Sequence, residues 1–472
     1  MPSAPARQRT ACCDRCAALE RDNAALRAEN QQLRTLLESE RRKGKRQAAP
    51  FSKGPPRSKP RRPGRRAGAR YGKRGHRQPP KHVDKVCDAP LPRHCPDCHG
   101  TLEHTEVRHQ YQTDIPPVRP QVTRFDVHVG HCTCCGKRVQ GRHPLQTSDA
   151  LGAAGSLIGP RAAALAVDLN KGIGLSYGKV QGVFADAFGL SITRGALCSM
   201  VARVGRAAEP TYQALSSWIR REPVVSPDET GWRVGALSAW LWAFVSPELT
   251  VYAIRPGRGF AEAAEILGDN FAGTLVRDGW RSYCCFCSAS HQTCCCHILR
   301  RCNNLLQTAQ RGAARVPHEV KRIIKSALAL RDRRDAGEIS THGLRVATGK
   351  IAARTDRLLS WNPTDPENAK LLDHLDRERQ HGALFTFLRD PNVPATNFWA
   401  EQAIRPAVVN RKVWGGNRTW SGAHTQEILT SVLRTCRQQG HHPSAILIDL
   451  LRSPDSTVAT LLRPSGLDAQ PP

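Results

Sequence analysis

The chain has 472 residues, which is enough for several domains and at least one large hydrophobic core. Its 70 Lys and Arg residues outnumber 41 Asp and Glu residues, and the resulting formal net charge of +29 indicates a polyanionic partner, above all nucleic acid. No secretory signal follows Met1 and no apolar run is long enough to span a bilayer, so we expect no membrane association, a cytoplasmic location and reduced cysteines.

Residues 17–43 carry the pattern of a short coiled coil. Three leucines recur every seven residues, and two asparagines and a leucine fill the second core position: Leu19, Leu26, Leu33, Asn23, Asn30 and Leu37. Asparagine at a core position favours a parallel dimer in register, so we predict a homo-oligomer formed through this leucine-zipper-like helix. The repeat covers only about three heptads, which leaves a short surface helix as the alternative.

The next segment is strongly basic. Residues 41–83 include 17 Lys and Arg residues, seven prolines and no acidic residue. Such a composition cannot bury enough apolar surface to fold, so we predict a disordered linker over residues 44–84. The sequence RRPGRR within it is expected to contact the minor groove of DNA through Arg61, Arg62, Arg65 and Arg66. A charge run that only solubilises the protein is the alternative.

Residues 85–145 contain two Cys-x-x-Cys pairs, Cys95/Cys98 and Cys132/Cys135. Four thiolates make a closed tetrahedral Zn²⁺ site, and the two-residue spacing lets each pair hold the metal from one tight turn. Gly136 supplies the positive φ that such a turn favours. We therefore predict a structural zinc ribbon.

Two strand-like stretches between these pairs complete the predicted ribbon, Arg108–Asp114 and Gln121–Val129. Other nearby side chains compete as ligands: Cys134, His94, His99 and His131.

Residues 150–220 are predicted to be helical. Helices are expected at Arg161–Asn170, Ser176–Phe188 and Thr193–Ala208, with Gly189 in a turn and Ser191 or Thr193 as the next N-cap. The spacing is typical of a helix-turn-helix that binds DNA, and equally of a helix pair that only packs against a core.

Two acidic residues follow short apolar runs. A β-branched run ends in Asp228, strands are expected at Leu237–Val245 and Thr250–Arg255, and a second run from residue 273 ends in Asp278. Glu229 is a rival to Asp228, but on a strand the two would point to opposite faces. An aspartate before glycine, as at Asp278, is also common turn chemistry.

A third acid, Glu401, lies on a predicted helix that begins at Thr396 or Asn397. Asn397, Glu401 and Arg405 recur every four residues and so share one helical face. Four cations follow the glutamate and are predicted to bind phosphates: Arg405, Arg411, Lys412 and Arg418. Two strand acids and a helix acid suit a pair of Mg²⁺ ions for phosphoryl transfer. A glutamate that only complements the helix dipole is the alternative for Glu401.

A mostly helical insertion, about residues 284–390, separates Asp278 from Glu401, with helices expected at Glu319–Arg331 and Asn368–Gln380. It opens with a cluster of thiols and one imidazole: Cys284, Cys285, Cys287, Cys294, Cys295, Cys296, His297 and Cys302. The sequence leaves open whether this cluster binds a second metal or only packs in the core.

An apolar stripe predicts a further helix at 426–437, and a C-terminal helix and tail are expected over residues 441–472.

Several motifs together resemble the bacterial DDE transposases of the insertion-sequence-66 family: DETGWRV, LVRDGW, the CCCH stretch, AEQAIRPAVVNRKVWGGNRT and QEILTSVLRTCRQQG. The order of zipper, basic linker, zinc knuckles and helical segment also matches, so the resemblance covers nearly the whole chain. The chain departs from the family pattern at Phe398, where an asparagine is usual, at Gln402, where an arginine is usual, and at Trp414, where a small residue is usual.

The resemblance implies a catalytic triad of Asp228, Asp278 and Glu401, supported by Asn397, and zinc ligands at Cys95, Cys98, Cys132 and Cys135. It also implies a multidomain fold with a coiled-coil helix, a zinc ribbon, a helix-turn-helix-like segment and an α/β ribonuclease H-like core over residues 221–440 that carries the helical insertion.

We therefore expect a nucleoid-associated bacterial transposase that binds terminal inverted repeats and target DNA and uses two Mg²⁺ ions to cut and transfer strands. A catalytically inactive DNA-binding relic is the alternative, and a nuclease without strand transfer is a third possibility. The sequence leaves open whether accessory proteins of the same element take part.

Overall fold

The structure, a computed structural model, describes residues 14–42, 77–104, 106–155, 157–453 and 461. The four arginines predicted for the minor groove lie outside these ranges: Arg61, Arg62, Arg65 and Arg66. Most of the predicted linker and, apart from Leu461, the tail beyond Ser453 are outside them as well. Within the described ranges, no helix combines the length and the apolar character needed to cross a membrane.

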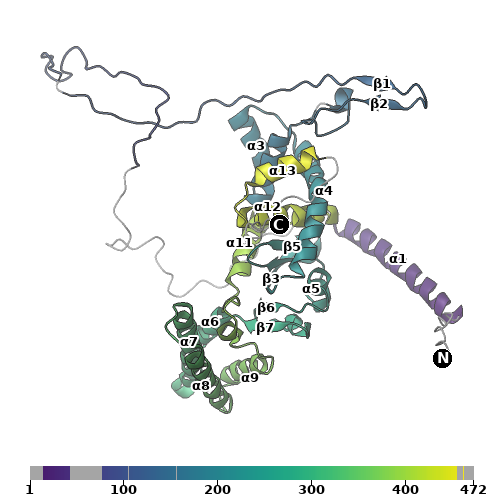
Figure 1. The fold of residues 1–472 in the computed structure, drawn as a ribbon, viewed down its shortest axis with the longest axis vertical. Coiled ribbons are helices and arrows are strands. Elements are labelled where there is room, and N and C mark those ends of the chain that lie inside the picture. Colours follow the sequence, from purple (N-terminus) through teal and green to yellow (C-terminus); the bar gives the residue numbers. More distant parts are fainter. Residues whose placement is uncertain (1–13, 43–76, 105, 156, 454–460, 462–472) are drawn as a thin grey trace, which may run out of the picture.

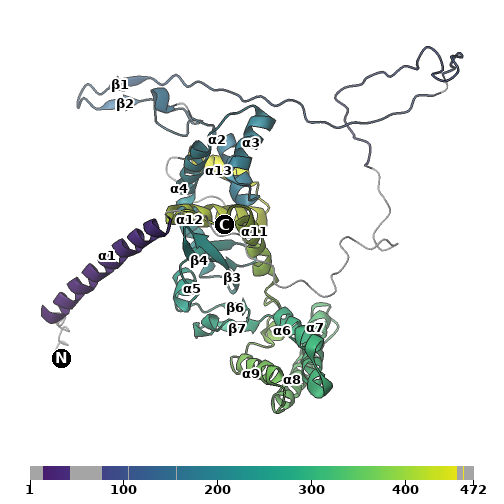
Figure 2. The ribbon, with the colours of Figure 1, turned by 180° about the vertical axis from the view of Figure 1, so that it is seen from behind.

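Helix α1 (Asp14–Arg42) covers the segment predicted to form a coiled coil. Its core-position leucines Leu26, Leu33 and Leu37 are exposed in the single chain. In Figures 1 and 2 the helix extends away from the remaining elements. The helix is therefore present, and its pairing with a second copy stays a prediction.

The predicted zinc ribbon is reduced to turns and one small hairpin, in which β1 (Val129–His131) pairs antiparallel with β2 (Arg138–Gln140). The strand predicted at Arg108–Asp114 is wrong, because this segment forms no regular structure. The strand predicted at Gln121–Val129 is also wrong except for its last residue. Within the described ranges neither segment has a partner strand, so neither has a ladder of hydrogen bonds to join.

The segment after residue 150 is helical, as predicted. Its elements are η2 (Gly152–Gly155), α2 (Pro160–Val167), a π-helical turn η3 (Asp168–Gly172), α3 (Tyr177–Phe188) and α4 (Arg194–Ile219). Gly189 ends α3 in the left-handed conformation at φ 62°, and the Thr193 hydroxyl caps α4 by accepting from the Ala196 N–H. Helix α4 runs past its predicted end because buried apolar residues continue at helical spacing: Ala208, Tyr212, Leu215 and Ile219.

A five-stranded sheet of order β5-β4-β3-β6-β7 forms the centre of the molecule. Its strands are β3 (Val224–Val234), β4 (Leu237–Val245), β5 (Thr250–Arg255), β6 (Thr274–Arg277) and β7 (Ser290–Thr293). The first three form an antiparallel meander, and β6 and β7 add to β3 in parallel. The strands predicted at 237–245 and 250–255 are confirmed. Helix α5 (Phe260–Leu267) and the turn η4 (Arg281–Cys285) flank β6 in the chain.

Helix α12 (Trp420–Gln438) covers the edge of the sheet at β5. Three of its polar side chains, four residues apart, accept hydrogen bonds from backbone N–H groups of β5: Glu427 from Ile254 at 2.7 Å, Ser431 from Tyr252 at 2.8 Å and Thr435 from Thr250 at 3.1 Å. This cover prevents the edge from pairing with another chain. The helix predicted at 426–437 is thus confirmed, with its apolar stripe buried.

The insertion between β7 and α11 (Phe398–Trp414) is a separate helical unit. Its elements are α6 (Cys295–Thr308), η5 (Arg311–Ala314), α7 (Arg315–Asp335), α8 (Thr341–Leu359), α9 (Pro366–Gln380) and α10 (Thr386–Arg389). The two helices predicted here lie within α7 and α9. The insertion packs around its own hydrophobic core, which joins the sheet through Val224 and Val276.

The helices and the sheet are stacked along the long axis of the molecule (Figures 1 and 2). Helices α2, α3, α4 and α13 (Pro443–Arg452) lie at one end, the sheet lies in the middle, and the insertion lies at the other end. One hydrophobic core extends from α2–α4 through the sheet to α12 and α13. The helical segment before the sheet therefore packs against the central core, and its binding to DNA stays a prediction.

Candidate catalytic site

Asp228 lies on β3, and Asp278 directly follows β6, the parallel strand beside β3. The register pairs Val224 with Thr274 and Val225 with Leu275, so each aspartate lies three residues beyond the last pair of the two strands. Both carboxylates are half-buried. The fold thus brings together two acids that are fifty residues apart in the sequence.

The sequence predicted that a strand ends at Asp228, and this prediction is wrong. Strand β3 continues to Val234, because the residues beyond Asp228 pair with β4 through, for example, Thr230 opposite Leu241. Only the first residues of β3 pair with β6. Asp228 therefore lies where β3 has separated from β6 but still pairs with β4.

Helix α11 brings Glu401 to the same place. Asn397 is the N-cap residue of this helix and is 1% exposed, but its side chain does not cap the helix. Its Nδ2 instead donates to the Pro227 carbonyl at 2.8 Å, and its backbone N–H donates to the Cys294 Sγ at 3.2 Å. The Glu401 N–H in turn donates to the Asn397 carbonyl at 3.1 Å. Asn397 therefore fixes the first turn of α11 beside Asp228.

The acids influence each other electrostatically. Burial, together with the negative charges of Glu229, Asp278 and Glu401, raises the pKa of Asp228 to about 7, and the hydrogen bond from the Glu229 N–H opposes this shift. Among the described residues, the oxygens of Asp228, Asp278 and Glu401 do not all lie within 4.8 Å of one another. Carboxylates that share two metal ions need not touch, and hard divalent cations prefer such oxygen ligands. The residues present therefore fit Mg²⁺.

Glu229 belongs to a buried hydrogen-bond network next to Asp228. Its carboxylate accepts hydrogen bonds from Arg258 Nε at 2.6 Å and from the Tyr283 hydroxyl. The Arg258 guanidinium lies 3.9 Å from the ring centroid of Trp280 and 4.9 Å from that of Trp240. This network links β3 to the loop after Asp278.

The Asp278 loop is also attached to the insertion. Arg277 is fully buried, pairs with Glu378 of α9 at 3.1 Å and donates to the Asp278 carbonyl at 3.0 Å. At Gly279, an added Cβ would lie 2.7 Å from His374 Cε1, so only glycine fits without displacing that ring. The insertion therefore supports the backbone on both sides of Asp278.

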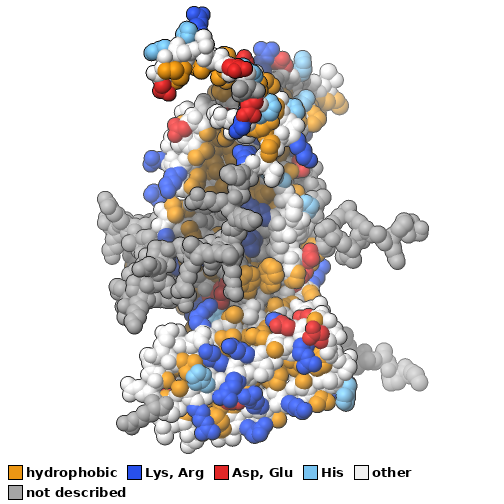
Figure 3. Space-filling view, turned by 90° about the vertical axis from the view of Figure 1, so that its left-hand side faces the viewer, with side chains coloured by type: hydrophobic (Ala, Val, Ile, Leu, Met, Phe, Trp, Pro, Cys, Tyr) orange, Lys and Arg blue, Asp and Glu red, His pale blue; other side chains and the backbone are white. Residues whose placement is uncertain are grey.

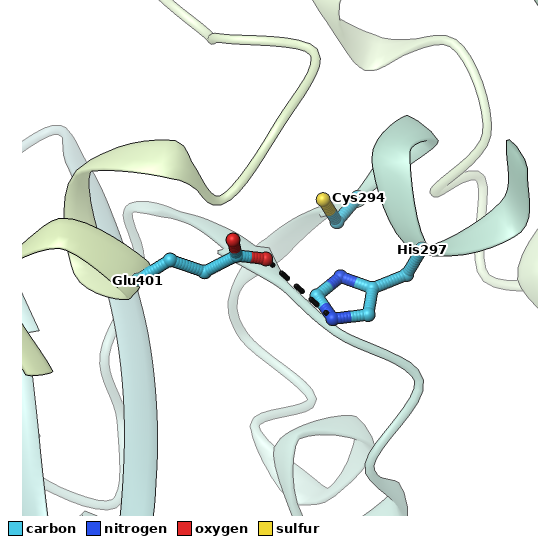
Figure 4. A group of neighbouring side chains, drawn as sticks. All are labelled: Cys294, His297 and Glu401. Atoms are coloured by element: carbon cyan, nitrogen blue, oxygen red, sulfur yellow. Dashed lines mark ion pairs between the residues drawn. The ribbon is translucent and has the colours of Figure 1, made fainter. Parts of the chain in front are cut away.

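One further group gathers at Glu401. Cys294, His297 and Glu401 each offer a ligand atom within 4.8 Å of the other two, and the described residues contain no second group of this kind (Figure 4). The Glu401 Oε1 lies 3.5 Å from the His297 Nε2 and 3.9 Å from an Arg300 nitrogen. Of the cysteine-rich stretch, Cys295 and Cys302 are buried in the core of the insertion. Of the predicted cluster of cysteines and one histidine, only Cys294 and His297 thus lie in a group that could bind a metal ion.

The four predicted phosphate-binding cations differ in their surroundings. Arg405, Lys412 and Arg418 are exposed. Arg411 is partly buried and donates to the Thr230 hydroxyl at 2.6 Å and to the Gly231 carbonyl, so it attaches α11 to β3. Lys and Arg side chains also spread over the insertion, in the lower part of Figure 3. Exposed examples on α7 and α8 are Lys325, Arg333, Arg345, Lys350 and Arg357.

Both zinc knuckles have the local geometry of metal ligands. The Gly136 N–H donates to the Cys132 carbonyl at 2.9 Å, and Gly136 has φ 69° as predicted. Hydrogen bonds from the backbone N–H groups of Cys98 and Asp97 lower the pKa of Cys95, and those of Cys135 and Cys134 do the same for Cys132. Within the described part of the chain, no three of the four predicted thiols lie within 4.8 Å of one another. Each pair of cysteines has ligands that suit Zn²⁺, but the structure does not bring the two pairs together around one metal position.

The residues that support the site could not be predicted from the sequence. Arg258 and Glu378 lie at least twenty residues from each of the three acids, and although Tyr283 lies only five residues after Asp278, no spacing rule connects any of the three to the site. Arg277 gave one usable signal, since a charged residue inside an otherwise apolar strand must find a buried partner. Phe398 and Trp399 form an exposed aromatic pair at the start of α11.

Residues 155–425, more than half of the chain, match the sequence profile of the IS66 transposase family. The matched range contains Asp228, Asp278, Glu401 and the whole insertion, and it begins after the zinc knuckles. No curated protein matches the chain.

Proposed function

Because the chain belongs to the IS66 family of transposases, we propose that it cuts DNA at the terminal inverted repeats of an insertion sequence and joins the freed ends to target DNA. Asp228, Asp278 and Glu401 are the proposed metal-binding carboxylates. One observation carries this assignment: two parallel strands and a helix, distant in sequence, bring these acids into one electrostatic cluster. The strand order, an antiparallel meander extended by two parallel strands, agrees with the ribonuclease H-like core that the resemblance implies.

The three carboxylates would hold a pair of Mg²⁺ ions. When bound, such a pair activates water or a 3′-hydroxyl for attack and stabilises the leaving oxygen of the scissile phosphate. The protein supplies the positioning. Asn397 holds the start of α11 against Pro227, and Arg277 holds the backbone at Asp278. These contacts preset the three acids before DNA arrives.

Other parts of the chain are proposed to bind and pair the DNA ends. Arg405 and Lys412 are exposed on α11, the helix that carries Glu401, and the exposed Arg418 follows this helix, so all three suit phosphate contacts. The basic segment with Arg61, Arg62, Arg65 and Arg66 is proposed to enter the minor groove. Helix α1 is proposed to join two copies, and therefore two ends, in one complex.

The two knuckles are proposed to close on one structural Zn²⁺ through Cys95, Cys98, Cys132 and Cys135. In support, each pair has backbone N–H groups directed at a sulfur that lower the pKa of one thiol. We place the reaction on nucleoid DNA in the bacterial cytoplasm, with accessory proteins of the same element as additional candidate partners.

The rival from another class is a DNA-binding relic without catalysis. Phe398 and Gln402 favour it, because they replace residues usual in the family directly beside Glu401. A nuclease that stops at free ends is a further alternative.

A strand-transfer assay separates these possibilities. The full-length protein is incubated with Mg²⁺ and a plasmid that carries the gene with its natural flanking DNA. We expect nicked and joined products that Asp278→Asn abolishes while DNA binding is retained. Asp269→Asn, an exposed acid before β6, is the matched control and should keep activity. Free ends without joined products would identify a nuclease, and DNA binding without any Mg²⁺-dependent product would identify a relic.

A further inference from the structure

We propose that Cys294, His297 and Glu401 form a Zn²⁺ site that competes with Mg²⁺ for Glu401. The site is distinct from the zinc knuckles, which lie in another part of the chain. Only the predicted consequence of Zn²⁺ binding, inhibition of DNA cutting, rests on the proposed function. Zn²⁺ binding itself is independent of any reaction.

The geometry comes from the junction of three elements. Cys294 is the N-cap residue of α6 and is 1% exposed, and His297 lies in the first turn of that helix. Backbone hydrogen bonds fix the junction, from the Cys294 N–H to the Arg277 carbonyl at 2.8 Å and from the Cys295 N–H to the Ala395 carbonyl at 3.0 Å. The side chains of Cys294 and His297 then face Glu401 across a short gap (Figure 4).

Two polar atoms at this junction point to a missing ligand. The Nδ1 of His297 and the Oε1 of Glu401 are both shielded from solvent and have no hydrogen-bond partner. Buried polar atoms almost always form hydrogen bonds, whereas the Glu401 Oε1 has only ion pairs of 3.5 and 3.9 Å, longer than a normal hydrogen bond, and the His297 Nδ1 has no hydrogen bond, so both atoms require an explanation. A metal ion would coordinate both residues at once.

The donor set selects the metal. Thiolate, imidazole and carboxylate suit Zn²⁺, whereas Mg²⁺ prefers oxygen ligands alone. Ligand atoms around tetrahedral Zn²⁺ lie roughly 3–4 Å apart, given bond lengths of about 2.0–2.3 Å, so the group needs to contract only slightly. Three protein ligands leave one position for water. The Arg300 guanidinium near Glu401 is mostly exposed and can move aside.

Occupation of this site has a consequence for the catalytic cluster. A Glu401 carboxylate bound to Zn²⁺ on the side of α6 is less available to metals at Asp228 and Asp278. Zn²⁺ would therefore inhibit strand cutting at concentrations far below those of Mg²⁺. The insertion would thereby make the enzyme sensitive to transition metals.

Metal content tests the site without DNA. Full-length protein is stripped with a chelator, equilibrated with Zn²⁺, freed of excess metal and analysed by elemental mass spectrometry. The wild type should hold one Zn²⁺ per chain more than Cys294→Ser, His297→Asn or Glu401→Gln. Cys296→Ser is the matched control, because this neighbouring thiol is exposed and outside the group. Circular dichroism shows whether each variant is folded. If Cys294→Ser does not fold, the Zn²⁺ content of His297→Asn decides the test.

Equal Zn²⁺ content in the wild type and in folded His297→Asn and Glu401→Gln proteins would overturn the proposal. In the DNA assay, the Zn²⁺ concentration that halves the Mg²⁺-dependent rate should rise at least tenfold in His297→Asn, measured against that variant's own uninhibited rate. An unchanged value would remove the inhibitory role. If no protein cuts DNA but the extra Zn²⁺ is present, the proposed function fails while the metal site stands.

Discussion

The Asn397 amide donates a hydrogen bond of 2.8 Å to the carbonyl of Pro227, the residue directly before Asp228. This bond joins the helix of one proposed metal ligand to the strand of another. It spans 170 positions of sequence and both partners are buried. The relative position of Glu401 and Asp228 therefore depends on one side chain that holds no metal itself.

Asn397→Ala should impair metal use more than DNA binding. The substitution removes the bond and leaves the Pro227 carbonyl buried without a partner, at a cost of about 1–3 kcal/mol. We expect the Mg²⁺ concentration for half-maximal DNA cutting to rise, with DNA affinity unchanged in a filter-binding assay. Thr396→Ala on the preceding residue is the control. A variant with normal Mg²⁺ dependence would show that Asn397 only stabilises the fold.

Glu378→Gln should destabilise the protein strongly. Arg277 would remain fully buried without its partner charge, and breaking a buried pair in this way costs about 3–5 kcal/mol. Urea unfolding followed by circular dichroism measures the change in the free energy of unfolding. Glu367→Gln on the same helix breaks the exposed pair with Lys370 and should cost less than about 1 kcal/mol. Equal effects of the two substitutions would contradict this account of the Asp278 loop.

The stability of the metal-free protein should depend on the protonation of Asp228. Burial, aided by neighbouring acids, raises its pKa from 3.8 to about 7, so between these values the folded state binds a proton that the unfolded state lacks. This contribution is full below pH 3.8 and is lost as the pH rises through about 7. With a chelator present, we compare the free energies of unfolding of the wild type and of Asp228→Asn. The wild-type value minus the variant value should fall between pH 5 and pH 8. A difference that is constant over this range would be inconsistent with the buried acid cluster.

Arg405 and Arg411 should behave differently although both were predicted to bind phosphate. Arg405→Ala, at an exposed position, should weaken DNA binding and reduce the salt dependence by about one phosphate contact. Arg411→Ala should chiefly lower the unfolding temperature, because it loses bonds to Thr230 and Gly231. DNA titrations at several salt concentrations, together with thermal unfolding, compare the two. The opposite pattern would mean that Arg411 leaves β3 to bind DNA.

The sequence was most informative where a local pattern decides the structure. Gly189 and Thr193 marked the end of α3 and the start of α4 because a left-handed glycine and a hydroxyl cap act within one turn. The predicted strands β4 and β5 followed from dense apolar and β-branched residues. The family profile, which needs no geometry, agrees with the resemblance seen in the motifs.

Long-range pairing could not be predicted in the same way. Strand β7, with the sequence SHQT, has no apolar alternation and exists because β6 supplies a partner. Arg108–Asp114 has a suitable composition for a strand but has no partner strand in the part of the chain that the structure describes, so it forms none. The position of Asp228 within β3 depends on the hairpin with β4, and the Arg277–Glu378 pair depends on how the insertion docks. These features belong to the tertiary structure.

Iron-directed cleavage of the protein backbone tests most directly whether the three acids share one metal site. Fe²⁺ replaces Mg²⁺ in the full-length protein, ascorbate and peroxide generate hydroxyl radicals at the bound ion, and the fragments are mapped by mass spectrometry. We predict cuts near residues 228, 278 and 401 that excess Mg²⁺ suppresses and that Asp278→Asn removes from all three segments. Cuts that avoid residues 228 and 278, or that excess Mg²⁺ leaves unchanged, would contradict the shared site.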